Sequence, residues 1–385
     1  MYKHPNRIML ILVPHDQVGG TERVALNLAH ALQTRGWTSR LVFPHTQNRS
    51  TLLSWCMEQG VRAVTTRAFG RWDAPHTWLG VMRLARYIRR HHPDVVNLHF
   101  GTHHPSFKDV LAVRLAGHHR CIVTVNHAAE WKGKADRKRL AAMLVGLLAN
   151  EIIVISAATQ KTMMAANIPA RKTHVIPCGL RVPKRFPTRA EARTRLGLSP
   201  DAFVIASIGR LVVAKGFAEL IRSAAQVSGA DLDLQLLIGG DGPDRPRFEE
   251  LAAQCLGHRA RLLGRIPDKV VEDIYAAADV FGLPSHLEGF GLIFVEAAFY
   301  AVPCIGTDVG GISDAIVHGE TGILVPLGDE QALTSAIQLL HDDPLLRVRL
   351  GHAARTRALT QFTEERMAIQ YEYLLHDSVR STTGL

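Results

Sequence analysis

Two glutamates stand eight positions apart around a glycine-rich turn in the second half of the chain. Glu288 and Glu296 belong to the run PSHLEGFGLIFVEAAFYAVPCIGTDVGG, residues 284–311. A helix is expected to begin near Phe290 or Gly291, because glycine tolerates the tight turn before a helix. The free N–H groups and the positive end of that helix suit an anion such as a diphosphate. Since successive helical residues rise by about 1.5 Å, both carboxylates can face one crevice and hold the two ends of a nucleotide-sugar.

Either glutamate by itself also fits a purely structural role. Glu288 would then cap the helix, and Glu296 would be a solvated helix residue. The run PCIGTDVGG favours a ligand site, because a buried strand leads into Thr307 and then into the pair Gly310-Gly311. This is a second turn whose glycines allow backbone conformations closed to other residues. It lies at the carboxyl end of a strand, the edge at which open α/β sheets bind ligands.

Two cations follow the strand that opens the second half of the chain. The apolar run 203–208 leads to Gly209 and Arg210, and Lys215 comes five residues later, before a helix. Cations over the mouth of a strand-to-helix loop can neutralise a diphosphate that departs in a transfer reaction. As isolated residues, Arg210 and Lys215 would instead be solvated surface cations.

A comparable loop stands near the start of the chain. The apolar run 7–14 is typical of a buried parallel strand. The loop HDQVGG then ends in Gly19 and Gly20, before a helix that begins at Thr21. A strand, a glycine turn and a helix N-terminus together form an anion site. The alternative is an ordinary tight turn between a strand and a helix.

The glycine-rich run with its E-x7-E spacing, PSHLEGFGLIFVE, resembles the retaining glycosyltransferases of family four. Further matches, among them the GGTE loop, extend the resemblance over most of the chain. The resemblance implies an α/β protein with the GT-B fold, in which two Rossmann-like parallel-sheet domains face a central cleft. It also implies transfer of a sugar from a nucleotide-sugar with retention of anomeric configuration, and with no metal at the reacting centre.

The resemblance implies roles for individual positions. Arg210 and Lys215 would neutralise the departing diphosphate, Glu288 would bind sugar hydroxyls and Glu296 the ribose. His127 matches a family histidine that faces the donor sugar, although a lone histidine after a strand is ordinarily a loop residue. The catalytic residues implied are His127, Arg210, Lys215 and Glu288. The donor-binding residues implied are Gly19, Gly20, Gly209, Arg265, Ile266, Gly289, Phe290, Gly291, Leu292 and Glu296.

The sequence favours no metal site. His99, His103 and His104 come at the end of a strand expected at 93–100, but no acid accompanies them. A polar loop that lines the cleft is therefore preferred to a metal centre. The D-x-D run at 231–233 precedes a strand, where an ion would lie away from the crevice. We expect no metal cofactor, with the nucleotide-sugar as a substrate.

Charge is divided unevenly along the chain. Residues 1–185 carry 27 Lys and Arg against 9 Asp and Glu, a net of +18, whereas the remaining residues carry 18 against 26, a net of −8. This asymmetry predicts a domain boundary near 185 and an acidic or membrane-surface partner for the first half. Nucleic acid is not expected, because no recognition motif accompanies the charge. The expected domains are 1–180 with a returning helix in 361–385, and 181–360, which binds the nucleotide-sugar.

The run KGKADRKRLAAMLVGLLA, residues 132–149, places cations before an apolar helix. One interpretation is a peripheral helix that rests on anionic lipid near a lipid-linked acceptor. The other is a surface helix whose apolar side lies in the core. Residues 140–149 favour the second interpretation, because they are apolar all round and so suited to burial.

Cysteine usage and the lengths of the apolar runs set the expected location. Five widely spaced cysteines with no C-x-x-C pair favour neither a disulfide framework nor a structural zinc site, which fits a reducing cytoplasm. The apolar runs 8–13 and 140–149 are too short for a signal-peptide core or a membrane span. We therefore expect a cytoplasmic protein, with peripheral attachment to the inner face of the cytoplasmic membrane as one option.

The sequence thus predicts a retaining hexosyltransferase that acts on a glycan or a lipid-linked acceptor in surface polysaccharide or lipopolysaccharide biosynthesis. Acceptor selectivity is expected in the loops 67–78 and 99–108. A nucleotide-sugar epimerase of the same fold is the alternative, but no second acid–base pair is visible for it. An NAD-dependent oxidoreductase is disfavoured, because VGGTER replaces the G-x-G-x-x-G signature. A nucleotide sensor without catalytic activity is a third alternative.

Overall fold

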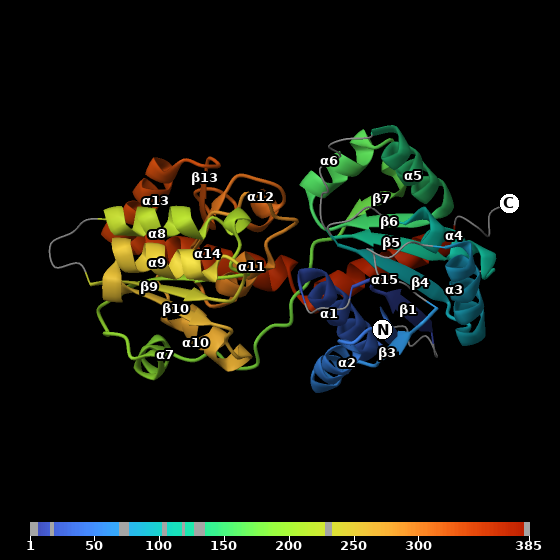
Figure 1. Cartoon of the computed structure of the whole chain (residues 1–385), viewed down its shortest axis with the longest axis horizontal. Helices are drawn as coiled ribbons and strands as arrows, with labels where there is room; N and C mark the ends of the chain where they lie inside the picture. The colour runs from blue at the N-terminus through green and yellow to red at the C-terminus, as the bar shows by residue number, and fades with distance from the viewer. Residues whose placement is uncertain are drawn as a thin grey trace. The chain divides into compact units, whose positions relative to one another are not determined.

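The computed structural model divides the chain into two compact units (Figure 1). Unit 1 comprises Met1–Arg181 and Phe362–Leu385, and unit 2 comprises Val182–Gln361. The residues that the structure describes are 7–15, 19–68, 77–101, 106–117, 120–126, 135–227 and 233–380, without the side chains of 135–139 and 376–380.

Unit 1 contains a seven-stranded sheet in the order β3-β2-β1-β4-β5-β6-β7, and every neighbouring pair is parallel. The strands are β1 (Ile8–Leu12), β2 (Thr38–Pro44), β3 (Ala63–Thr66), β4 (Val95–Phe100), β5 (Cys121–Val125), β6 (Glu151–Val154) and β7 (Thr173–Val175). The central strands β1, β4 and β5 are almost wholly buried, as expected of strands that helices cover on both faces. The strand order reverses between β1 and β4, which defines the switch point of this sheet.

Helices cover both faces of the first sheet. They are α1 (Gly20–Thr34), α2 (Arg49–Glu58), α3 (Trp78–His91), α4 (Phe107–Leu115), α5 (Ala135–Leu148), α6 (Ala157–Ala165), the 3-10 turn η1 (Ala170–Lys172) and α15 (Glu364–Arg380). The last of these, α15, comes from the end of the chain and packs against α1. Its Tyr371 is 1% exposed and bonds Thr124 of β5 across 3.0 Å, so this helix belongs to the core of unit 1.

Unit 2 repeats the plan with six parallel strands in the order β10-β9-β8-β11-β12-β13. The strands are β8 (Phe203–Ile208), β9 (Leu234–Gly239), β10 (Ala260–Gly264), β11 (Val280–Leu283), β12 (Cys304–Thr307) and β13 (Gly322–Val325). Here the order reverses between β8 and β11. Both sheets therefore have the doubly wound topology in which ligands bind at the carboxyl ends of the strands beside the switch point.

The helices of unit 2 alternate with its strands, starting before β8, and two of them follow β13. They are α7 (Arg189–Leu196), α8 (Phe217–Gln226), α9 (Arg245–Cys255), α10 (Asp268–Ala277), α11 (Leu292–Phe299), α12 (Ile312–Ala315), α13 (Glu330–Asp342) and α14 (Pro344–Gln361), with 3-10 turns η2 (Val213–Lys215) and η3 (Gly257–Arg259). The two units confirm the predicted pair of Rossmann-like parallel-sheet domains.

A buried ion cluster fastens α7 to the sheet of unit 2. The carboxylate of Asp279, which is 1% exposed, accepts from Arg193 across 2.8 Å and from the backbone N–H of Val204 across 2.9 Å. Arg193 is 3% exposed and also donates to the carbonyl of Ala277. Arg189 reaches the second oxygen of Asp279 at 2.7 Å. The cluster compensates the desolvation of the two most buried charges, a cost that neither could offset alone.

Helix α5 has one side in the core of unit 1, as the favoured interpretation of residues 132–149 expects, but its apolar residues are not all buried. In α5, Ala142 and Val145 are buried, but Leu140, Met143 and Leu147 are half to three-quarters exposed. The helix is therefore apolar on its solvent face as well as on its core face.

Candidate functional site

The loops at the carboxyl edge of the second sheet are held together by backbone contacts. Gly209 N–H donates to Gly239 O across 3.0 Å, and Gly240 N–H donates to Gly264 O across 2.8 Å. These bonds join the loops that follow β8, β9 and β10. Ile266 packs against Gly239, where an added Cβ would lie 2.4 Å from its Cδ1. The predicted positions Gly209 and Ile266 thus share one continuous rim.

The loops after β8, β11 and β12 meet at two glycines. Any larger residue at either position would push the neighbouring backbone away. Gly216 has φ +73°, and a Cβ there would lie 2.1 Å from the carbonyl oxygen of Pro284. Gly310 has φ +56°, and a Cβ there would lie 2.1 Å from the carbonyl oxygen of Glu288. Only glycine adopts these conformations with so little space. The loop that follows β11 and carries Glu288 is therefore held between the loops that follow β8 and β12 at the switch point.

Lys215 and Glu288 form an ion pair across this switch point. Lys215 ends η2, after β8, and its Nζ donates to Oε1 of Glu288, which follows β11. Ser285 Oγ donates to the same oxygen across 3.3 Å, and the two side chains of the pair are 24% and 15% exposed. The pairing leaves both charged groups at the edge of the sheet, partly open to solvent. The structure thus brings together two residues that lie 73 positions apart in sequence.

Helix α11 begins directly after the glycine-rich turn. Its N-cap is Gly291 with φ +84°, a residue that has no side chain to cap the helix. The backbone N–H groups of its first turn are consequently available to an anion, as the sequence predicts. The side chain of Phe290 is 2% exposed and belongs to the core, so a ligand can reach this position only through its backbone.

Glu296 lies in the second turn of α11 and is tied to the neighbouring helix. The hydroxyl of Tyr275, in α10, donates to its Oε2 across 2.9 Å. Tyr275 in turn stacks on Tyr300, with ring centroids 5.5 Å apart. The sequence did not identify Tyr275, because nothing local distinguishes it from any other core aromatic residue of an amphipathic helix.

The two predicted arginines of unit 2 are exposed. Arg210 follows Gly209 at the end of β8, and Arg265 follows β10. Within the described part of the chain, neither side chain has an ion-pair partner. Lys215 is therefore the predicted cation that the fold already holds in place, whereas Arg210 and Arg265 are solvated at the same edge.

In unit 1, the predicted glycine loop carries a histidine–glutamate pair. Gly19 is the N-cap of α1, and Gly20 is its first residue. Glu22, in the same turn, is 3% exposed and accepts from Nδ1 of His15 across 2.7 Å. The His15 ring lies against Gly101 after β4, where an added Cβ would be 2.4 Å from Cε1. The pair thus occupies the switch point of the first sheet, and the sequence identified neither member as a site residue.

His99 is a buried residue of β4 and not part of a polar loop, so that prediction is wrong for this histidine. It is 0% exposed, and its Nε2 lies 3.1 Å from Nδ2 of Asn97. Burial lowers its pKa to about 3, which keeps the ring neutral. His103, His104 and the predicted catalytic His127 lie outside the described residues, and the role of His127 stays a prediction.

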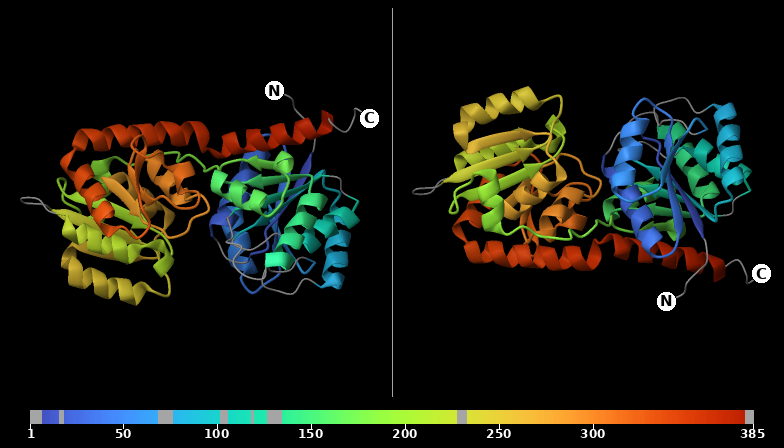
Figure 2. Two further views of the ribbon diagram at one scale, coloured as in Figure 1. Left: turned by 90° about the horizontal axis from the view of Figure 1, so that it is seen from above. Right: turned by 90° about the horizontal axis from the view of Figure 1, so that it is seen from below.

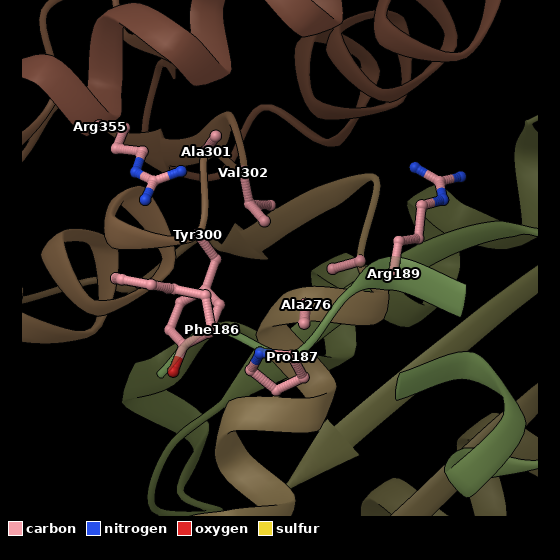
Figure 3. Close-up of a pocket in the computed structure, with 9 residues that line it drawn as sticks. Phe186, Pro187, Arg189, Ala276, Tyr300, Ala301, Val302 and Arg355 are labelled. Carbon is pink, nitrogen blue, oxygen red and sulfur yellow. The ribbon is translucent and has the colours of Figure 1, made fainter. Parts of the chain in front are cut away.

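A cavity of about 240 Å³ lies at the opposite edge of unit 2 (Figure 3). Its lining comes from the segment before α7, from the end of α10 and from the residues that lead into β12: Phe186, Pro187, Arg189, Ala276, Ala278, Tyr300, Ala301 and Val302, with Arg355 of α14. Apart from Arg355, these positions precede strands, whereas Lys215 and Glu288 follow them. The cavity is thus separate from the Lys215–Glu288 pair, although its Tyr300 stacks on Tyr275, the partner of Glu296.

Both units match known protein families. Residues 18–182 match the family described as Glycosyltransferase Family 4, and residues 188–357 match Glycosyl transferases group 1. Among curated relatives, the N-acetyl-alpha-D-glucosaminyl L-malate synthase of Bacillus anthracis is 34% identical over 49% of each chain. The capsular polysaccharide biosynthesis glycosyltransferase CapM of Staphylococcus aureus is 32% identical over 48% of each. The chain thus aligns with about half the length of the curated relatives it matches.

Solved structures share the fold of the whole chain at low identity. Anabaena HepE in complex with UDP aligns with a TM-score of 0.81 and 20% identity, over 96% of this chain and 99% of its own. The apo form of the lipopolysaccharide outer core galactosyltransferase WaaB aligns with a TM-score of 0.70 and 18% identity, over 97% and 99%. Fold and sequence together define a GT-B protein. The chain belongs to the glycosyltransferases that these two families describe, Glycosyltransferase Family 4 in its first half and Glycosyl transferases group 1 in its second.

Proposed function

We propose that this protein transfers a sugar from a nucleotide-sugar to a glycan or lipid-linked acceptor, with retention of anomeric configuration. The proposal rests chiefly on the Lys215–Glu288 pair at the switch point of unit 2. The pair sets a cation and a carboxylate beside the uncapped start of α11. This combination suits a ligand that carries both phosphates and hydroxyl groups.

In the proposed reaction, the bond between the anomeric carbon and the diphosphate oxygen breaks while the acceptor oxygen bonds that carbon on the same face. The acceptor hydroxyl gives up its proton to the departing diphosphate oxygen. Negative charge grows on the departing diphosphate. Lys215 and the first N–H groups of α11 stabilise this charge, and Arg210 adds a second cation from the same edge. Glu288 accepts hydrogen bonds from the sugar hydroxyls, and Glu296 from the ribose. No residue is assigned as a nucleophile, and none of these steps uses a metal.

The first test is a thermal-shift screen of UDP, GDP, ADP and their sugars. Uridine nucleotides come first, because HepE, which shares the fold, was solved in complex with UDP. A nucleotide-sugar at a hundred times its dissociation constant should stabilise the protein by about 2.7 kcal/mol. Absence of stabilisation by every nucleotide would contradict the proposal. Once a donor is found, the coupling constant of the anomeric proton in the product, measured by NMR, decides between retention and inversion.

The charge of the first half and the named relatives support the acceptor class. Residues 1–185 carry a net charge of +18, which suits an anionic or lipid-linked glycan. One relative, CapM, is named for capsular polysaccharide biosynthesis. We accordingly propose a part in surface polysaccharide or lipopolysaccharide biosynthesis at the inner face of the cytoplasmic membrane. Transfer of radiolabelled sugar into a chloroform-soluble product of bacterial membranes would support it, and transfer only into water-soluble products would contradict the lipid-linked acceptor.

A further inference from the structure

Helix α3 exposes a cluster of large apolar side chains at its N-terminal end. Trp78, Leu79 and Met82, which we term the α3 patch, are 62%, 59% and 60% exposed. The opposite side of the helix is buried in the core of unit 1, through Val81, Leu84, Ala85 and Ile88. The fold therefore does not require the apolar side chains of the patch, since the core face of α3 is already complete.

The rest of the solvent face of α3 is cationic. The exposed residues that follow the patch along the helix are Arg83, Arg86, Arg89 and Arg90. No acidic residue occurs in Trp78–His91. A fifth cation, Lys108 of α4, places its Nζ 5.4 Å from the centre of the Trp78 ring. The solvent face thus begins apolar and continues as a row of positive charges.

This order of residues matches a helix that lies at the surface of an anionic bilayer. Tryptophan and methionine or leucine side chains enter the boundary between headgroups and acyl chains, while arginines remain at the headgroups. Nucleic acid is a poorer match, because phosphate contacts use the cations but leave an exposed tryptophan and its apolar neighbours without a role. Single exposed apolar residues are ordinary, but three neighbouring ones beside four arginines indicate a partner.

The position of the patch places it beside the ligand edge of unit 1. Helices that follow parallel strands begin at the carboxyl end of the sheet, so Trp78 and Lys108 both lie towards that edge. Helices α3, α4 and α5 are neighbours in one layer (Figure 2). The exposed Leu140, Met143 and Leu147 of α5 add apolar surface to this layer. Among the described helices, none has the length and apolar composition to cross a bilayer.

We propose that the α3 patch and the arginines that follow it form the surface through which unit 1 binds anionic lipid bilayers. The patch inserts at the interface and the arginines bind the phosphates of the headgroups. Only the purpose of this surface depends on the proposed function. That purpose is to bring the ligand edge of unit 1 to a lipid-linked acceptor. Binding itself needs no donor and no acceptor.

The test is flotation of the full-length protein with vesicles of phosphatidylcholine, with and without phosphatidylglycerol. The wild type should float with the phosphatidylglycerol vesicles and dissociate as salt is raised. The variant Trp78→Ser/Leu79→Ser/Met82→Ser should bind at least about tenfold more weakly, because it loses the inserted apolar area. The variant Arg83→Glu/Arg86→Glu should also lose about tenfold or more, since each basic residue contributes about fivefold near an anionic surface.

Matched controls separate the surface from general effects of the substitutions. Met57→Ser removes a 76% exposed apolar side chain from α2, and Arg247→Glu reverses an exposed charge in unit 2. Both should bind vesicles like the wild type. All variants should retain the wild-type melting temperature and the nucleotide-dependent thermal shift, so a failure of the donor assignment is recognised separately.

Three results would overturn the proposal. The first is a failure of the wild type to bind phosphatidylglycerol vesicles, or a patch variant that binds them as tightly as the wild type. The second is a patch that holds two copies of the chain together, seen as a halving of mass in the triple variant by light scattering. The third is binding of duplex RNA that depends on the same residues and competes with the vesicles.

Discussion

At the scale of single residues, the contact between Lys215 and Glu288 is central to the proposed site. Both side chains are only partly buried, yet each is the other's charged partner, and Ser285 adds a second hydrogen bond to the carboxylate. Such a pair is positioned before any ligand arrives, because the backbone clamps at Gly216 and Gly310 fix the loops that carry it. Preorganised charges of this kind lose little in reorganisation when a transition state forms.

We predict that Glu288→Gln lowers the transfer rate by about a hundredfold or more while the fold is retained. The neutral amide oxygen accepts from the ammonium of Lys215 and from sugar hydroxyls less strongly than a carboxylate does. The rate is measured as nucleotide release with the donor found by the thermal-shift screen. The control is Glu330→Gln, which removes the carboxylate that pairs with Arg222 elsewhere in unit 2. Equal loss in both variants would show that only stability had been measured.

Buried His99 gives a prediction on pH. Its folded pKa is depressed by burial to about 3, against an ordinary value of 6.5. As the pH falls below 6.5, the unfolded chain binds a proton at this ring and the folded chain does not, so stability is present above 6.5 and declines towards 3. The wild type should lose about 1.4 kcal/mol more per pH unit than His99→Gln between about pH 6 and pH 4. Urea unfolding measures this difference, and parallel slopes for the two proteins would refute it.

The sequence predicts some of these residue positions and not others. The loop around Glu288 could be predicted as a ligand site, because the glycines, the acids and the start of a helix stand together in one run of sequence. The His15–Glu22 pair and the bond from Tyr275 to Glu296 could not, since each joins residues whose proximity depends on packing rather than on local order. His99 was misassigned for a related reason: a polar residue at a strand end reads as a loop unless its buried partner, Asn97, is known.

At the scale of elements, the start of α11 is close to its predicted place. The helix was expected near Phe290 or Gly291, and it begins at Leu292 with Gly291 as its N-cap. Glycine turns and caps are local signals, so boundaries of this kind can be predicted. The exposure of α5 could not be predicted, because a helix that is apolar all round gives no preference for either face.

The ion cluster between α7 and the sheet yields an element-scale prediction. Asp279→Ala should lower the free energy of unfolding by about 3 to 5 kcal/mol, because it leaves the buried guanidinium of Arg193 without its counter-charge. Chemical denaturation measures the loss. Asp273→Ala is the control, since it removes a carboxylate that pairs with Arg195, also of α7, near the surface. Its effect should be much smaller, and equal losses would mean that burial does not set the cost.

At the scale of the whole molecule, each unit has its own sheet and its own buried core. The parallel pairing in both sheets follows from the alternation of strands and helices along the sequence, but the order of the strands within each sheet does not. The crossing of α15 to unit 1 was expected from the resemblance alone. Its own sequence shows an amphipathic helix but does not say which core its buried face completes.

We therefore predict that the two units unfold in separable transitions. Differential scanning calorimetry of Asp279→Ala should show a lower transition for unit 2 and an unchanged one for unit 1. Tyr371→Ala, which opens a cavity beneath α15, should do the reverse, with a loss of about 3 to 5 kcal/mol in unit 1. The exposed Tyr373→Ala is the control, as its side chain is 69% exposed. A single transition that shifts as one in both variants would contradict independent cores.

The chain leaves unit 1 and returns to it at one point. Leu180 bridges Thr363, with its N–H bonded to Phe362 O across 2.8 Å and its carbonyl accepting from Glu364 across 2.9 Å. Val182–Gln361 is thus an insert whose two ends are fastened side by side in its host. A segment inserted in this way can be exchanged between family members through two adjacent junctions. Under the proposed function, such an exchange would change the donor site without redesign of unit 1.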